Sequence, residues 1–299
     1  MFGHPSFSVE PWRVTETELD LSVLAQTESV FALSNGHLGL RGNLDEGEPF
    51  GLPGTYLNSV YELRPLPYAE AGYGYPESGQ TVVNLTNGKV IRLLVDDEPL
   101  DVRYGTLHSH GRTLDLRAGV LRRELVWSSP AGATVRVRST RLVSLVQRAA
   151  AAIRYEVEAV DRPVRVVVQS ELVANEPVPE LTGDPRVAAA LDSPLEAEEN
   201  GAMGLAGLLT NRVRQSGLRV AAAMDHDLDA PGPTQESAES LGDVARVTVI
   251  GRLEPGARLR LTKYLAYGWS HERSRSALHD QVRGAIGVAR SVGWDGMVS

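Results

Sequence analysis

The sequence lacks cysteine entirely, so its 299 residues form no disulfide and no thiolate metal site. It also lacks an excess of basic residues, because 38 Asp and Glu outnumber 30 Lys and Arg and the formal net charge is −8. Proteins that bind nucleic acids need a basic face to contact phosphates. The charge therefore argues against a nucleic-acid partner.

Long apolar runs are absent as well. No window of 18 uninterrupted apolar residues occurs, and the N-terminal stretch MFGHPSFSVEPWRV has neither a basic start nor an apolar run. We therefore expect no transmembrane helix, no secretory signal and no membrane partner. A cytoplasmic location is the corresponding expectation.

Short strand-like runs dominate what is present. The stretch KVIRLLVDDEPLDVRYG (89–105) reads as two β-rich runs around an acidic turn, which predicts a hairpin. The stretch 112–144 gives further strands with breaks at 118–119 and 129–132. In TVRVRS (134–139) apolar and polar residues alternate, as in a strand with one buried face. The prediction is an all-β fold, a large antiparallel β-sandwich, since no βαβ rhythm is visible.

Three segments break this pattern. Residues 64–80 are rich in proline, glycine and tyrosine, and residues 175–201 contain a possible short helix at 186–191. Residues 225–240 are polar and are the segment predicted to be disordered.

The tail of the chain predicts one long helix. An apolar stripe at helical spacing runs along it, and Gly293 is suited to cap its C-terminus. The stripe comprises Leu278, Val282, Ala285, Ile286 and Ala289. Such a stripe needs a surface to cover, either the sandwich or a domain absent from this chain.

The glycine-rich stretch ESVFALSNGHLGLRGN (28–43) raises the question of a phosphate cradle. It contains neither G-x-G-x-x-G between a strand and a helix nor G-K-S/T. Asn35-Gly36 is instead a tight-turn dipeptide, flanked by the strand-like runs VFAL and HLGL. The stretch is therefore predicted to form a glycine-permitted corner of a sheet.

Two patterns resemble metal sites, and neither is complete. In a strand, His108 and His110 would share one face, but no third ligand is nearby in the sequence, so surface histidines are favoured. The second pattern has calcium-loop spacing, but Ala230 stands where the loop needs glycine. It comprises Asp225, Asp227, Asp229 and Glu236. We therefore predict no bound metal.

Arginines form a locally basic zone between residues 117 and 148. The favoured interpretation is that they line the solvated faces of strands and pair with acids such as Glu124, with a domain contact as the second interpretation. The zone comprises Arg117, Arg122, Arg123, Arg136, Arg138, Arg141 and Arg148.

No catalytic centre can be read from the residues. The chain has no G-x-S-x-G nucleophile signature and no cysteine nucleophile, and its carboxylates form no recognisable acid–base pair. The tyrosines of the 64–80 segment, Tyr68, Tyr73 and Tyr75, are candidates for an exposed contact surface.

Five stretches taken together resemble the N-terminal part of glycoside hydrolase family 65. They are ESVFALSNGHLGLRGNLDEGEPFGLPGTYLNSVYE (28–62), VNLTNGKVIRLLVDDEPLDVRYG (83–105), RTLDLRAGVLRRELVWSSPAGATVRVRSTRLVSL (112–145), AAIRYEVEAV (151–160) and LTKYLAYGWS (261–270). The family includes phosphorylases of maltose, trehalose, kojibiose and nigerose and some hydrolases.

The resemblance implies a domain plan. Residues 1–270 would be the N-terminal β-sandwich, and residues 271–299 would begin a helical linker to a catalytic α/α barrel that this chain does not contain. The general acid and the phosphate-binding residues would lie in that barrel, so this chain would hold no catalytic residue and would be inactive alone. It would need no cofactor, and inorganic phosphate would be a co-substrate of a parent phosphorylase.

Three hypotheses of function follow. The first is the non-catalytic sandwich domain of an inverting α-glucoside phosphorylase or hydrolase, supporting its partner barrel and a possible homodimer. Substrate-binding or domain-interface candidates are then Asn35, His37, Arg41, Asn43 and Glu46, with Tyr73 and Tyr75. The second is a free-standing carbohydrate-binding sandwich with the tyrosine-rich segment and exposed tryptophans as its platform. The third is a structural module that dimerises through a sheet edge or an apolar face.

Overall fold

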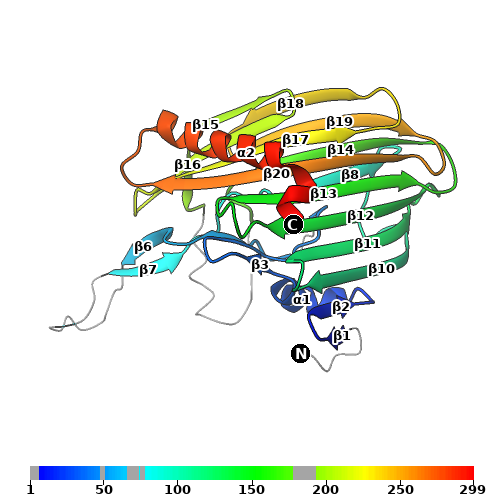
Figure 1. The fold of residues 1–299 in the computed structure, drawn as a ribbon, viewed down its shortest axis with the longest axis horizontal. Coiled ribbons are helices and arrows are strands. Elements are labelled where there is room, and N and C mark those ends of the chain that lie inside the picture. The colour runs from blue at the N-terminus through cyan, green and yellow to red at the C-terminus, as the bar shows by residue number, and fades with distance from the viewer. Residues whose placement is uncertain (1–6, 48–50, 66–73, 75–77, 178–192) are drawn as a thin grey trace.

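The fold is an antiparallel β-sandwich with one long helix, as the sequence predicts. We describe it from a computed structural model over residues 7–47, 51–65, 74, 78–177 and 193–299 (Figure 1). The predicted helix at 186–191 lies outside these residues. Within the described chain, no helix is long and apolar enough to cross a membrane.

The larger layer is a ten-stranded sheet in which all neighbours are antiparallel. In spatial order its strands are β1 (Phe7–Glu10), β2 (Arg13–Glu16), β10 (Thr106–Asp115), β11 (Val120–Ser128), β12 (Thr134–Val143), β13 (Ala150–Ala159), β20 (Arg258–Ser270), β17 (Arg219–Asp229), β16 (Ala206–Val213) and β15 (Leu195–Met203).

A five-stranded sheet forms most of the opposite layer. Its strands are β18 (Gln235–Leu241), β19 (Val244–Leu253), β14 (Val164–Val173), β8 (Ile91–Val95) and β9 (Glu98–Pro99). The predicted 89–105 hairpin is confirmed as β8 and β9, joined through Asp96 and Asp97 at positive φ. Alternating residues of both sheets meet in one core, which includes Trp127, Tyr155 and Val168.

Smaller elements complete that opposite layer. They are the 3-10 turn Leu21–Val23, the helix α1 (Leu24–Val30), a three-stranded sheet of β3 (Leu33–Ser34), β4 (Leu38–Leu40) and β5 (Thr55–Leu57), and the hairpin of β6 (Tyr61–Pro65) and β7 (Ser78–Val82). The Asn35-Gly36 turn between β3 and β4 is confirmed, with Gly36 at φ +81°. The VFAL flank was predicted to be strand-like; instead Val30 ends α1, and β3 is only two residues long.

The helix α2 (Arg275–Val298) lies on the outer face of the ten-stranded sheet (Figure 1). Its predicted stripe is confirmed: Leu278, Val282, Ile286 and Ala289 pack with Tyr264 and Ala266 in a second apolar cluster. Gly293 has φ +70° and non-helical ψ, so the first helical segment ends at this glycine as predicted, and a second short helical segment that contains the buried Trp294 continues to Val298. The apolar stripe is therefore covered by the sandwich itself.

The prediction of disorder at 225–240 is wrong. The segment contains the end of β17 and most of β18, which pair with β20 and β19 respectively. The polar residues of β18 are mostly exposed because β18 is the edge strand of its sheet, and backbone pairing does not require apolar side chains there. The four acidic residues with calcium-loop spacing also lie in β17 and β18. Two of them, Asp225 and Asp227, form ion pairs with Arg290 of α2.

Candidate functional site

Three buried arginines hold the glycine-rich segment against the ten-stranded sheet. Arg112, Arg123 and Arg141 come from the adjacent strands β10, β11 and β12. Each stands at an inward position of its strand, as Arg141 follows Val137 and Ser139 on one face of β12. All three are at most 5% exposed. They face residues 41–47, which cover this part of the sheet.

Arg112 makes the first of these anchors. Its Nε lies 2.6 Å from Glu16 Oε2, its Nη1 donates to the carbonyl of Gly42 at 3.0 Å, and its Nη2 donates to Thr27 Oγ1 at 2.9 Å. A Cβ on Gly42 would lie 2.6 Å from Phe31 Cβ, so this close approach requires glycine. The anchor therefore joins α1, β2 and the glycine-rich segment to β10.

Asp45 and Glu46 bind the other two arginines. Arg141 Nη2 lies 2.7 Å from Asp45 Oδ1 and also donates to the carbonyl of Asn43. Arg123 Nη1 lies 2.6 Å from Glu46 Oε2, and the Tyr155 hydroxyl donates to Glu46 Oε1 at 2.6 Å. A buried charge is tolerated only when it is paired in this way. We call Glu16, Asp45, Glu46, Arg112, Arg123, Arg141 and Tyr155 the arginine anchor.

The arginines of the anchor lower the pKa of Asp45 and of the neighbouring His110. Burial would raise the pKa of Asp45, but the positive charges of Arg141 and Arg123 outweigh it and lower that pKa. Burial, and then Arg123 and Arg112, lower the pKa of His110 to about 2, so this imidazole is neutral and its Nε2 accepts from Arg123 Nε at 3.2 Å. The Asp45 carboxylate is thus ionised and paired with arginine.

A second feature is the turn that joins β12 and β13. Leu145 and Val146 at its tip are 75% and 92% exposed. Asn35 Nδ2 donates to the carbonyls of Ser144 and Arg148, and Asn35 Oδ1 accepts from the backbone N–H groups of His37 and Leu38. One asparagine thus fixes both the β3–β4 turn and the tip. We call Leu145 and Val146 the hairpin tip.

The predicted site residues therefore separate into two groups. Asn35 and half-buried His37, whose pKa is lowered by burial and by Arg148, lie beside the hairpin tip. Arg41 bonds Glu28, Asn43 bonds the carbonyl of Leu52, and Glu46 is buried in the anchor. Tyr68, Tyr73 and Tyr75 lie outside the described residues.

Two predictions about the strands are corrected. His108 and His110 do not share a site, because a β-bulge between Leu107 and Ser109 separates them; His108 is exposed at Ser128 and His110 is buried. Among the described residues, no cluster of three or more His, Asp or Glu could hold a metal ion. Arg136 and Arg138 do pair with Glu124 and Glu158 on the solvated face, whereas Arg123 and Arg141 are buried.

Most residues of the arginine anchor were not predicted from the sequence, although the alternation within β12 pointed to one of them. The alternation that places Val135 and Val137 inside β12 also places Ser139 and Arg141 inside. Asp45 lies in a segment without strand pairing, and Glu16 ends a strand of only four residues, so neither contact could be read from residue spacing.

The two packed β-layers and the outer helix place the chain in the class of large antiparallel β-sandwich domains. The family model "Glycosyl hydrolase family 65, N-terminal domain" matches residues 14–299, and the chain belongs to this family. The resemblance inferred from the sequence is thus confirmed.

Relatives and a solved structure agree with this assignment. The chain is 62% identical over its whole length to an uncharacterized glycosyl hydrolase of Mycobacterium leprae and to one of Mycobacterium tuberculosis, and it spans 38% of their length. It is 29% identical over 92% of its length to the alpha,alpha-trehalose phosphorylase of Thermoanaerobacter brockii, spanning 36% of that protein. A structure named "Putative kojibiose phosphorylase from human microbiome" has the same fold, with a TM-score of 0.86, 21% identity and coverage of 98% of this chain and 37% of that one.

Proposed function

We propose that the chain is the non-catalytic sandwich domain of a family 65 α-glucoside phosphorylase or hydrolase, and that it supports the catalytic part of a longer polypeptide. The relatives at 62% identity are glycosyl hydrolases by name, and the chain spans 38% of their length. The anchor carboxylates favour a structural role, since each is engaged by arginine.

The observation that carries this proposal is the hairpin tip. Adjacent leucine and valine side chains are 75% and 92% exposed. Two hydrogen bonds from Asn35 Nδ2 hold the turn that carries them, and two to Asn35 Oδ1 hold Asn35 itself in the β3–β4 turn. Burying such a side chain contributes about 1.5–3 kcal/mol, so an ordered, exposed pair is suited to a protein contact. The occupant we propose is the catalytic part of the same polypeptide.

The helix α2 does not contribute to this docking argument. The apolar stripe of α2 is covered by the ten-stranded sheet. A chain with this stripe covered could also fold as an independent module. The carbohydrate-binding alternative is therefore kept, and its predicted tyrosine platform lies outside the described residues.

In the proposed parent enzyme the reaction inverts the anomeric centre. A carboxylic acid protonates the glycosidic oxygen while phosphate, or water activated by a base, attacks from the opposite face. The acid and the phosphate site belong to the catalytic part, and the roles of this chain are packing and pairing of protomers.

The test is an activity assay of the 299-residue chain. We expect neither glucose release nor glucose phosphate formation from trehalose, maltose, kojibiose or nigerose, with or without phosphate. Turnover at a rate comparable to that of a full-length relative would overturn the non-catalytic assignment.

A further inference from the structure

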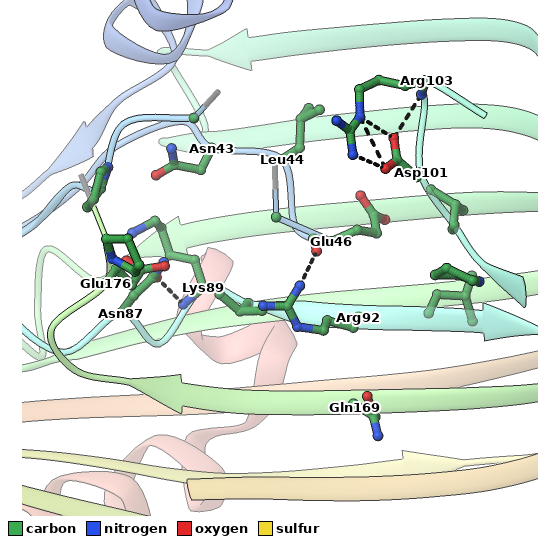
Figure 2. Close-up of a pocket in the computed structure, with 18 of the residues that line it drawn as sticks. Asn43, Leu44, Glu46, Asn87, Lys89, Arg92, Asp101, Arg103, Gln169 and Glu176 are labelled. Carbon is green, nitrogen blue, oxygen red and sulfur yellow. Dashed lines mark hydrogen bonds and ion pairs between the residues drawn. The ribbon is translucent and has the colours of Figure 1, made fainter. Parts of the chain in front are cut away.

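A pocket of about 680 Å³ lies between residues 43–47 and 51–53 on one side and the outer face of the five-stranded sheet on the other (Figure 2). Strands β8 and β14 form its floor, through residues that include Arg92 and Gln169, and residues 99–103 close one side. The volume falls within the range of small-molecule sites, which is about 300–1,000 Å³. Neither the arginine anchor nor the hairpin tip accounts for it.

The strongly basic side chains of this pocket face carboxylates. Arg92 pairs with Glu171 at 3.1 Å and Arg103 pairs with Asp101. Burial lowers the pKa of Lys89 to about 7, so Lys89 carries only part of a positive charge at neutral pH. Lys89 is buried, and its Nζ donates to the carbonyl of Gly54 and to Thr55 Oγ1. In its ammonium form it has a third N–H donor, which has no partner among the described residues. A neutral polar ligand fits this surface better than an anion does, because the cations already face carboxylates.

Side-chain amides supply further hydrogen-bonding capacity. Asn43 Oδ1 is buried and has no partner among the described residues, a condition that costs free energy unless a ligand or water meets it. Figure 2 shows Asn43 facing the side of the pocket that carries Asn87, Lys89 and Glu176. Gln169 lies on β14, the strand next to β8 and its Arg92. No hydrogen bond of the Gln169 amide to a described residue is found.

Apolar residues line the pocket together with these amides. The lining includes Leu44, Leu52, Pro53, Leu94 and Leu100. Sugars present hydroxyl groups that both donate and accept, together with C–H faces that pack on apolar surface, so amides beside leucine and proline match both features.

We propose that this pocket binds a neutral saccharide of one or two hexose units, with Asn43, Lys89 and Gln169 meeting its hydroxyl groups. This inference does not depend on the proposed function. It also differs from the predicted tyrosine platform, since no aromatic residue is among the described lining.

The test is isothermal titration of the 299-residue chain with glucose, maltose and trehalose, alongside Gln169→Ala and Asn43→Ala. We expect saturable binding of at least one sugar, weakened about fivefold or more by the loss of each amide. Asn200→Ala is the matched control, because Asn200 is an exposed amide on β15 and its loss leaves affinity unchanged.

Three outcomes would overturn the proposal: no saturable binding of any of the three sugars, equal affinity in wild type and Gln169→Ala, or binding of inorganic phosphate in preference to sugar. Gln169 is half-buried and is not part of the arginine anchor, so its variant keeps the test valid if Asn43→Ala fails to fold.

Discussion

At the scale of single residues, the most consequential feature is that long basic side chains point into the sandwich and are hydrogen-bonded there. Arg112, Arg123 and Arg141 contact backbone carbonyls, carboxylates or both, and buried Lys263 donates to the carbonyls of Val90 and Glu171. These contacts position irregular segments that lack strand pairing with the large sheet. The irregular part of the opposite layer is thus held by polar bonds as well as by the apolar core.

The anchor predicts a large effect from removing one cation. Arg141→Met leaves Asp45 paired only with Arg123, so we expect the free energy of unfolding to fall by about 3–5 kcal/mol. Urea unfolding followed by circular dichroism measures this loss. The control is Arg138→Met on the solvated face, which should cost less than about 1 kcal/mol. Equal losses for the two variants would contradict the anchor.

His226 predicts a pH dependence. It is buried between the carbonyl of Leu205 and Ser170 Oγ, and burial, followed by the charge of Lys263, lowers its pKa to about 3. Between its unfolded pKa of 6.5 and that value, the unfolded chain binds the additional proton. The stabilisation by neutral His226 is therefore complete above pH 6.5 and is lost as the pH falls towards 3, at up to about 1.4 kcal/mol per pH unit.

Replacing the histidine tests this assignment. His226→Gln retains a donor and an acceptor but does not titrate, so its unfolding free energy should fall less steeply than that of wild type between pH 6.5 and pH 4. Thermal melts across that range give the slopes, and identical slopes would exclude His226 as the cause.

At the scale of elements, how much could be predicted depended on periodicity. The β8–β9 hairpin, the strands on either side of 118–119 and 129–132, and the stripe of α2 all have a clear period, and all are confirmed. The β17–β18 region was predicted wrongly, because an edge strand forms backbone bonds without an apolar face. The bulge at His108 leaves no mark in residue spacing.

The contact between α2 and the sheet predicts a second stability effect. Leu278 is a residue of α2 that is fully buried against the ten-stranded sheet, where its Cδ1 lies close to Gly268 of β20. The change Leu278→Ala should therefore lower the free energy of unfolding by about 2–5 kcal/mol. Val288, which is 53% exposed on the same helix, provides the control, and Val288→Ala should change stability by less than about 1 kcal/mol. A Leu278→Ala variant as stable as wild type would mean that α2 does not rest on the sheet in solution.

At the scale of the whole molecule, the chain combines an internally satisfied core with an exposed apolar tip. The apolar core lies between the two layers of the sandwich and is complete without a further domain. The exposed hairpin tip is the surface that we propose contacts a further part of the polypeptide. Family membership was predictable from the 28–62 stretch and its companions. The tip was not, because Leu145 and Val146 continue an apolar pattern in sequence and their exposure depends on the turn that Asn35 holds.

The most direct test of the central claim is association in trans. The part of the Mycobacterium tuberculosis relative that this chain does not cover would be produced separately, mixed with the 299-residue chain and followed by sedimentation velocity. We predict a complex whose affinity falls at least about tenfold when Leu145 and Val146 are both changed to aspartate, because their burial is lost. Met203→Asp, at an 84% exposed residue of the β15–β16 turn, should leave the affinity unchanged. Absence of a complex, or equal affinity of the tip variant and wild type, would contradict the account.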